Sequence, residues 1–247
     1  MLEMPTSANS ASILPRRIKT GTNSKLVASV PVFLCVNYAE AKPDYEPDIP
    51  EPTSSPPVDW IDLSLDEKTA NKMLWITDGG YKVARMTDDL TCPVLDRPER
   101  YEDVPQVLCK EGILGSRGYW EVTYTGWVVI GVAFEGAGRR LQEGPCGLGE
   151  NDESWALGWG GSHYQMWFNG TYSEIWDVPQ YTTLGVYLDH PAGVINFYGI
   201  ELKKEEGAER KEEIRLLQHI KSPFKGKMMP GFWIGQRSSC SFVKPEE

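Results

Sequence analysis

The chain is poor in the residues from which metal sites and redox centres are built. Its 247 residues include three His and five Cys, and no two Cys have the C-x-x-C spacing. A zinc finger or a RING domain therefore has no ligand set, and no two His stand at a metal-binding spacing. The odd number and wide spacing of the cysteines indicate reduced thiols in an intracellular protein, so we expect a cytoplasmic location.

Positive charge and long apolar runs are also scarce. The chain has 25 Lys and Arg against 35 Asp and Glu, which gives a net charge of −10 and a pI of about 4.9. Such a surface repels phosphate backbones and anionic lipids, so we expect no nucleic-acid partner and no membrane partner. No apolar run approaches the ~20 residues that span a bilayer.

Motifs of the common enzyme chemistries are missing as well. The sequence has no G-x-S-x-G elbow and no P-loop, and its short glycine pairs lack the rest of a dinucleotide fingerprint. His190 follows a predicted strand, and no partner that would make it a catalytic base is recognisable, which favours a turn residue. We expect a protein that is not an enzyme and that has no cofactor and no metal.

One acidic cluster keeps an alternative open. Glu150, Asp152 and Glu153 stand beside Trp155, and a pair of carboxylates near aromatic side chains is what a glycosidase requires. In a chain so rich in acidic residues, a polar turn that leads into a strand is the simpler interpretation. A glycan-binding or glycan-active sandwich is therefore the second hypothesis for function.

Composition divides the chain near residue 57. Nine of the 18 Pro lie in the first 57 residues, and the stretch 42–57 is rich in Pro and acidic residues, as extended linkers are. We predict a disordered tail at residues 1–57 and one structural domain at residues 58–247. The apolar stretch 26–36 leaves a targeting signal within residues 1–41, and hence secretion, as a minor alternative.

What the domain has in abundance is aromatic residues, glycine and strand-forming runs. Nine Trp, eleven Tyr and 24 Gly occur in the chain. Apolar or alternating runs separated by Gly, Asn and Pro predict an all-β sandwich. The predicted strands are residues 119–126, 127–134, 155–159, 164–168, 183–189 and 193–198. Asn169-Gly170 predicts a type I′ hairpin, residues 66–72 predict a short helix with Asp66 as its N-cap, and the charged run 203–213 predicts a solvated loop.

The aromatic residues divide into two groups. Some lie in apolar strand contexts and are expected in the core: Trp120, Trp127, Trp155 and Trp167. Others lie beside polar residues or glycine near predicted loops, where exposed Trp and Tyr commonly anchor binding surfaces: Trp159, Tyr164, Tyr172, Trp176 and Tyr181.

Several motifs, taken in order, resemble the PRY-SPRY domain family. Two segments resemble the PRY half: IDLSLD at residues 61–66 and LWIT at residues 74–77. A longer series of segments resembles the SPRY half: GYWEV at 118–122, IGVA at 130–133, LGENDESWAL at 148–157, GVYLD at 185–189 and PGFW at 230–233. We assign residues 58–108 to the PRY segment and residues 109–247 to the SPRY segment. The sequence of these segments is most similar to domains of fish tripartite-motif (TRIM), NLR-like and stonustoxin-like proteins.

The resemblance implies a bent sandwich of two antiparallel sheets with a short helical PRY segment. It also implies protein recognition through variable loops at one end, mapped here to residues 86–104, 135–147, 159–164 and 199–213. The protein-binding residues expected on these loops and beside them are Arg139, Arg140, Trp159, His163, Tyr164, Tyr172, Trp176 and Tyr181. The implied role is the target-binding part of a TRIM-like or innate-immune protein, without the ligase activity, since RING, B-box and coiled-coil sequences are not recognised. A stonustoxin-like assembly subunit is the third hypothesis.

Overall fold

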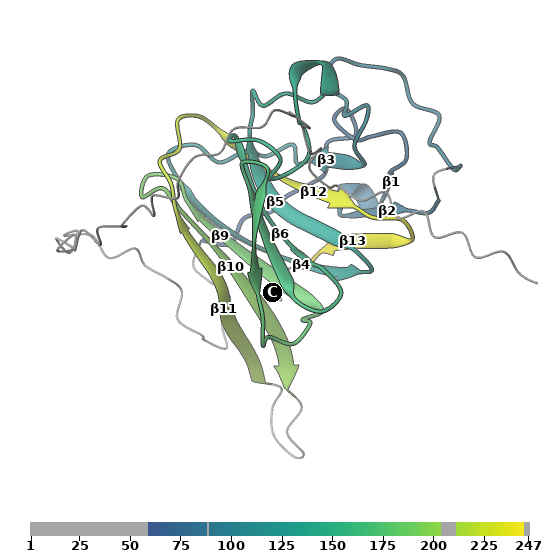
Figure 1. The fold of residues 1–247 in the computed structure, drawn as a ribbon. Helices are drawn as coiled ribbons and strands as arrows, with labels where there is room; N and C mark the ends of the chain where they lie inside the picture. The colour runs from purple at the N-terminus through teal and green to yellow at the C-terminus, as the bar shows by residue number, and fades with distance from the viewer. Residues whose placement is uncertain (1–58, 88, 204–210, 245–247) are drawn as a thin grey trace, which may run out of the picture. The chain divides into compact units, whose positions relative to one another are not determined.

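The computed structural model describes residues 59–87, 89–203 and 211–244. The predicted tail, including the segment considered as a targeting signal, lies outside the described residues. The described chain forms two antiparallel sheets that share one apolar core (Figure 1). The predicted all-β sandwich is therefore confirmed.

The first sheet has seven strands in the order β1-β2-β13-β4-β9-β10-β11. These strands are β1 (Trp75–Thr77), β2 (Lys82–Arg85), β13 (Ser238–Phe242), β4 (Arg117–Thr125), β9 (Thr183–Asp189), β10 (Val194–Lys203) and β11 (Lys211–Lys221). The second sheet has six strands in the order β3-β12-β5-β6-β7-β8. These strands are β3 (Gln106–Leu108), β12 (Met228–Ile234), β5 (Val128–Phe134), β6 (Ser154–Trp159), β7 (Tyr164–Phe168) and β8 (Thr171–Ile175).

The strand predictions are confirmed, and β7 and β9 have the predicted bounds. Asn169 and Gly170 join β7 to β8 with φ angles of 52° and 67°. A type I′ turn requires positive φ at both central residues, and Asn and Gly are the residues that adopt it at least cost. The turn fixes the register of this hairpin, so that Trp167 pairs with Tyr172.

The core forms where alternate side chains of the two sheets meet. Trp120 and Val122 of the seven-stranded sheet share one buried cluster with Ile130 and Leu157 of the six-stranded sheet. Trp155 is buried in the same cluster, so the core placement predicted for Trp120 and Trp155 is confirmed. Side chains two residues apart on a strand point to the same face, so every second residue of these strands faces the core. A strand that is covered on one face therefore has an alternating sequence, and a strand that is covered on both faces has a continuous apolar one.

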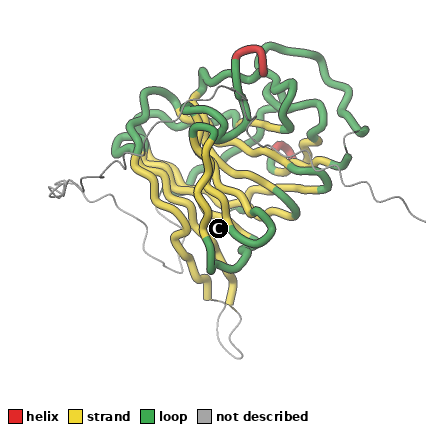
Figure 2. Tube along the Cα trace, in the orientation of Figure 1, coloured by secondary structure: helices red, strands yellow, loops and turns green. Residues whose placement is uncertain are grey.

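The helix predicted at residues 66–72 is wrong, because this segment forms turns. The Asp66 carboxylate accepts a hydrogen bond from the Lys68 N–H at 3.0 Å, and the Thr69 hydroxyl accepts one from the Leu108 N–H at 2.9 Å. Polar side chains that bond to nearby backbone compete with helix formation. Helix in the described residues is confined to two 3-10 turns, η1 (Asp78–Gly80) and η2 (Leu141–Glu143) (Figure 2).

The loop predicted at residues 203–213 is wrong at both ends. Strand β10 extends to Lys203, β11 begins at Lys211, and these two residues pair with each other. Residues 204–210 lie outside the described residues. The error arises because β11 is an edge strand, and edge strands carry charged residues that resemble a loop in the sequence.

Candidate functional site

Loops cover one half of the outer face of the six-stranded sheet. Tyr101, Ala137, Cys146 and Leu148 come from these loops, and they form a second buried cluster with sheet residues such as Ala156. Burial raises the pKa of the Tyr101 hydroxyl to about 12 and the pKa of the Cys146 thiol to about 11. Loop residues thus close this half of the sheet against water.

Arg139 and Arg140 hold the two covering loops together. Arg140 pairs with Asp96 at 2.7 Å and with Glu102 at 3.0 Å, and the hydrogen bond that it donates to the Asp96 carboxylate raises the pKa of the Arg140 guanidinium. Arg139 donates to the Glu99 carbonyl at 3.0 Å. Both guanidinium groups therefore connect the loop at residues 86–104 to the loop at residues 135–147.

The other half of this face carries an exposed tryptophan at the turn between β4 and β5. Trp127 is 47% exposed, and its ring lies 5.2 Å from the ring of Trp233 on β12. The Trp127 N–H donates to the Ser238 hydroxyl at 2.9 Å, and its carbonyl accepts from the Gly235 N–H at 2.8 Å. These two hydrogen bonds fix the backbone that carries the exposed ring.

One row of paired residues crosses the sheet beside these tryptophans. Trp233 pairs with Val129, Val129 with Gly158, Gly158 with Gln165, and Gln165 with Glu174. Four inter-strand steps make this row roughly 19 Å long. Its middle position has no side chain, and its far end is polar.

A second aromatic group lies at the far end of the row. Trp176, which follows β8, is 53% exposed, and its ring stacks on His163 with centroids 4.0 Å apart. The Trp176 indole donates to the Glu174 carboxylate at 2.9 Å, while His163 contacts the Ser162 hydroxyl at 2.9 Å. We give the name aromatic rim to the exposed Trp127, Tyr172 and Trp176 together with the half-buried Trp233.

The two halves of the chain match two adjoining families. The SPRY-associated (PRY) domain matches residues 63–113, and the SPRY domain matches residues 117–247. The chain belongs to the PRY-SPRY family. This bears out the resemblance drawn from the sequence motifs.

Relatives of this PRY-SPRY chain are much longer proteins. Stonustoxin subunit beta of Synanceia horrida is 31% identical over 180 residues, which cover 71% of this chain and 24% of the subunit. Tripartite motif-containing protein 16 of Mus musculus is 25% identical over 180 residues, which cover 72% of this chain and 30% of that protein. The chain therefore spans about a quarter of the length of these relatives.

Solved structures show the same PRY-SPRY fold. The stonustoxin structure superposes with a TM-score of 0.63 at 29% identity, over 74% of this chain and 27% of that chain. The TRIM65 PSpry domain superposes with a TM-score of 0.66 at 21% identity, over 79% of this chain and all of that one.

Three of the aromatic residues predicted to bind protein serve the core of the PRY-SPRY domain instead. Tyr164 is 0% exposed and Tyr181 is buried, and the Tyr181 N–H donates to the Tyr164 hydroxyl at 2.8 Å. Burial raises the pKa of Tyr164 far above its ordinary value. Trp159 is half-buried and packs edge-on against Tyr164 at 4.8 Å. Strict alternation from Trp155 along β6 puts Trp159 on the core side, a signal that the sequence already contained.

The prediction for Trp127 is wrong in the opposite sense, because Trp127 was expected in the core and is exposed. The apolar run 127–134 appears continuous, but β5 begins only at Val128, and Gly126 has a φ of 75°. Glycine adopts this left-handed conformation without strain, so the chain turns at Gly126 and leaves Trp127 outside. Met86 and Leu90 are also exposed, and they lie in the segment 86–104 that was predicted as a loop.

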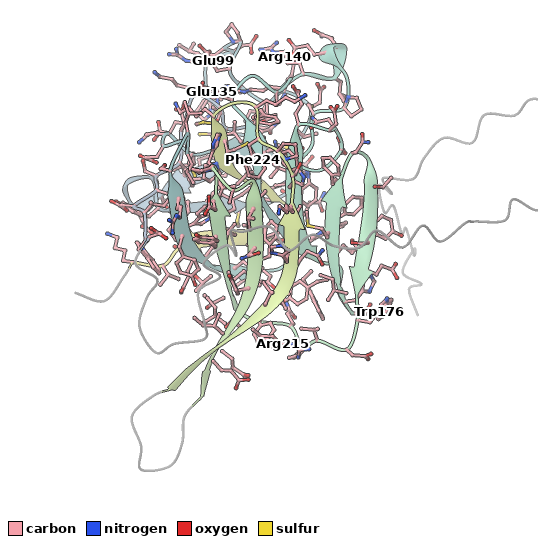
Figure 3. The ribbon with its side chains drawn as sticks, turned by 90° about the vertical axis from the view of Figure 1, so that its left-hand side faces the viewer. Glu99, Glu135, Arg140, Trp176, Arg215 and Phe224 are labelled. Carbon is pink, nitrogen blue, oxygen red and sulfur yellow. The ribbon has the colours of Figure 1, made fainter. Side chains whose placement is uncertain are left out.

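The eight predicted site residues do not form one site. Figure 3 shows Arg140 and Glu99 at one end of the strands and Trp176 at the other. The expectation that all of the variable loops lie at a single end is therefore wrong. Of the eight residues, His163, Tyr172 and Trp176 lie beside or within the aromatic rim.

The rest of the described chain adds two further findings. Within residues 59–87, 89–203 and 211–244, no group of three His, Cys, Asp or Glu is placed to hold a metal ion. No helix in these ranges is long and apolar enough to cross a membrane. His190 lies in a turn, where its Nε2 contacts the Gly226 carbonyl at 2.8 Å, as predicted for a turn residue.

Proposed function

We propose that this chain is a non-catalytic protein-recognition module that binds its partner on the aromatic rim. PRY-SPRY domains act generally as protein-interaction modules, and the rim supplies the surface that such a role needs. Trp127 stands on a hydrogen-bonded backbone and contacts Trp233, and the Trp176 ring is held by Glu174 and His163. Side chains that are already ordered lose little freedom on binding, which makes them effective anchors. The observation that carries the proposal is the pair of exposed tryptophans, Trp127 and Trp176, on the two sides of one rigid face.

The proposal extends to the protein that contains the module. We infer that the module is the target-binding part of a TRIM-like or innate-immune protein in the cytoplasm. The similarity to tripartite motif-containing protein 16 supports this context. So do the unpaired thiols of the described cysteines, which are Cys92, Cys109, Cys146 and Cys240, because reduced thiols are typical of that compartment.

Affinity capture with the full chain as bait tests the rim. We expect the Trp127→Ala and Trp176→Ala variants each to lose captured proteins, with affinities about 10-fold to 100-fold weaker. Trp75→Ala is the matched control, since Trp75 is also an exposed tryptophan but lies on β1 of the other sheet.

Two results would contradict the proposal. One is an equal loss of captured proteins in the Trp75→Ala control, which would indicate nonspecific binding to exposed tryptophans. The other is capture of glycoproteins that enzymatic deglycosylation abolishes, which would favour the glycan-binding hypothesis. Urea unfolding of each variant checks that the fold is intact before binding is compared.

A further inference from the structure

A cleft of about 610 Å³ opens at the end of the strands opposite Trp176. Its lining comes from the end of β5, the turn before β6, the end of β7 and the connection from β11 to β12. Figure 3 shows Glu135, one of its lining residues, near Phe224 at that end of the strands. The volume falls within the range of small-molecule sites. Nothing in the rim described above extends into this cleft.

The floor of the cleft is aromatic and rigid. Trp155 is only 3% exposed. Its ring stacks on Phe168 at 5.1 Å and meets Phe134 edge-on at 5.7 Å. Phe224 closes against another edge of Trp155 at 5.5 Å. Three of these four rings line the cleft, and all are fixed by their mutual packing, so the floor is preformed.

The two sides of the cleft carry opposite charge. The Phe134 N–H donates to the Glu153 carbonyl, and the Glu135 N–H donates to the Lys227 carbonyl. Strand β5 therefore ends with the acidic turn of Asp152 and Glu153 on one side and the basic connection on the other. The charged residues that line the cleft are Glu135, Asp152, Glu153, Lys225 and Lys227.

One ion pair accounts for only part of this charge. Lys227 pairs with Glu135 at 3.0 Å. Asp152, Glu153 and Lys225 are exposed, and within the described part of the chain their side chains form no hydrogen bond or ion pair. Two carboxylates on one side and one ammonium on the other thus remain available to a ligand.

We propose that this cleft binds a zwitterion of the phosphocholine type. The quaternary ammonium lies on the half-buried rings of Phe134 and Phe168, which Trp155 supports from below. It lies toward Asp152 and Glu153, and the phosphate lies toward Lys225. Cations are attracted to aromatic faces, and aromatic sites are a recurrent means of recognising quaternary ammonium groups. A quaternary ammonium donates no hydrogen bond, so an apolar floor leaves it no unpaired donor, whereas a Lys ammonium brings three.

The charge of the whole chain favours a zwitterion over a simple anion. At a net charge of −10, the protein repels free phosphate and anionic lipids at long range. A phosphocholine diester, as in a phosphatidylcholine headgroup, has no such net repulsion, because its single phosphate charge and its ammonium charge cancel. Free phosphocholine is a phosphate monoester with a phosphate charge of about −1.5 to −2, and its ammonium makes it less negative than phosphate alone. The site is independent of the two tryptophans that carry the proposed function, because Trp127 precedes β5 and Trp176 follows β8 at the other end of the strands, so either proposal can fail while the other stands.

Titration of the ¹⁵N-labelled full chain with phosphocholine, followed by two-dimensional NMR, tests this cleft. We expect saturable shifts of the Trp155 indole N–H and of the Gly136 and Gly226 amides, with a Kd of roughly 0.1–1 mM. The Trp127 and Trp176 indole signals should stay in place. Absence of saturable shifts at the cleft, or equal shifts at the rim, would overturn the proposal.

Charge variants separate the two arms of the ligand. The Asp152→Asn/Glu153→Gln double variant and the Lys225→Gln variant should each weaken phosphocholine binding about tenfold. Glu201→Gln, at an exposed residue of β10 outside the cleft, is the charge control and should bind as the unaltered chain does. Choline alone and inorganic phosphate alone should bind more weakly than phosphocholine. Equal binding of choline alone would overturn the zwitterionic assignment.

Vesicles distinguish the source of the headgroup. Flotation with neutral phosphatidylcholine vesicles that free phosphocholine reverses would identify a lipid surface as the source. Binding of soluble phosphocholine without vesicle flotation would identify a free or protein-attached headgroup. Both results support the site, and the cleft variants should leave partner capture on the aromatic rim unchanged.

Discussion

The two halves of the outer face of the six-stranded sheet differ in what covers them. On one half, loops bring Tyr101, Cys146 and Leu148 onto the strands and bury them. On the other half, Trp127 and Trp176 stand exposed at the strand ends. The covered half uses its loop residues for stability, and the open half leaves its aromatic side chains available for contact with another molecule.

The comparison separates surface side chains that are bonded to a neighbouring loop from surface side chains that remain free on a fixed backbone. Arg139 and Arg140 lie in a loop that was expected to bind protein, but both are engaged in hydrogen bonds to the neighbouring loop. Trp127 has its backbone fixed by two hydrogen bonds while its ring remains free. A rigid backbone that carries a free aromatic ring is the arrangement expected of a recognition surface.

The largest expected effect comes from breaking the covered half with Arg100→Ala. The Arg100 side chain is buried and donates to the carbonyls of Glu67, Ala70 and Leu95. Its removal leaves buried acceptors unpaired, so we expect the free energy of unfolding to fall by about 3 kcal/mol. Urea denaturation measures this, with the exposed Arg97→Ala as the control. An unchanged unfolding midpoint in Arg100→Ala would show that the loop cover does not depend on this side chain.

The next largest effect distinguishes Trp159 from Trp176. Trp159 is half-buried against the core, so Trp159→Ala should lower the free energy of unfolding by about 2 kcal/mol, somewhat less than for a fully buried Trp. Trp176→Ala should cost well under half as much and should act on partner binding instead. Thermal unfolding and affinity capture on the same samples decide between the roles. A Trp159→Ala variant of unaltered stability and impaired binding would restore Trp159 to the binding surface.

The strands could be predicted from the sequence because their signal is local. Alternating apolar residues and Asn-Gly or Gly punctuation predicted β7 and β9 to the residue. The side of the sheet on which each aromatic side chain lies was predicted less well. The pleat of β6, counted from Trp155, places Trp159 inside, so this part of the core was available to sequence reasoning. The exposure of Trp127 was not, because the sequence places a boundary between two strands at Gly126 but does not show that Trp127 stays outside β5.

The rest of the site depends on contacts between distant segments. The hydrogen bonds of Arg140 span about forty positions of the chain, and the stacking of Trp176 on His163 requires the register of β7 with β8. No local pattern predicts which loop an arginine will contact. The same limit explains the helix wrongly predicted at residues 66–72, where the Leu108 N–H engages Thr69 from far along the chain.

Alkaline pH should weaken the covered half in a predictable window. The pKa of Tyr101 is raised from 10.0 to about 12 by burial, so the folded state holds its proton while the unfolded chain releases it. The stabilisation is complete below about pH 10 and is lost as the pH rises through about 12, with a loss of about 1.4 kcal/mol expected at pH 11. Tyr101→Phe should remove this part of the pH dependence, measured by urea denaturation at pH 8 and pH 11. An identical slope in the variant would assign the alkaline loss to other buried tyrosines.

The smallest expected effect tests whether Arg140 belongs to the cover or to the binding surface. Its carboxylate partners, Asp96 and Glu102, are largely exposed, and exposed ion pairs contribute little to stability. Arg140→Ala should therefore lower the thermal midpoint by only a few degrees, and by less at high salt, because ions screen the pairs. Arg140→Lys should recover only part of the loss, since an ammonium lacks the planar fork that reaches both carboxylates. Partner binding should be unchanged in both variants when it is measured beside Trp127→Ala. If Arg140→Ala instead abolished binding at full stability, the covered half would itself be a recognition surface, and the contrast between the two halves would no longer hold.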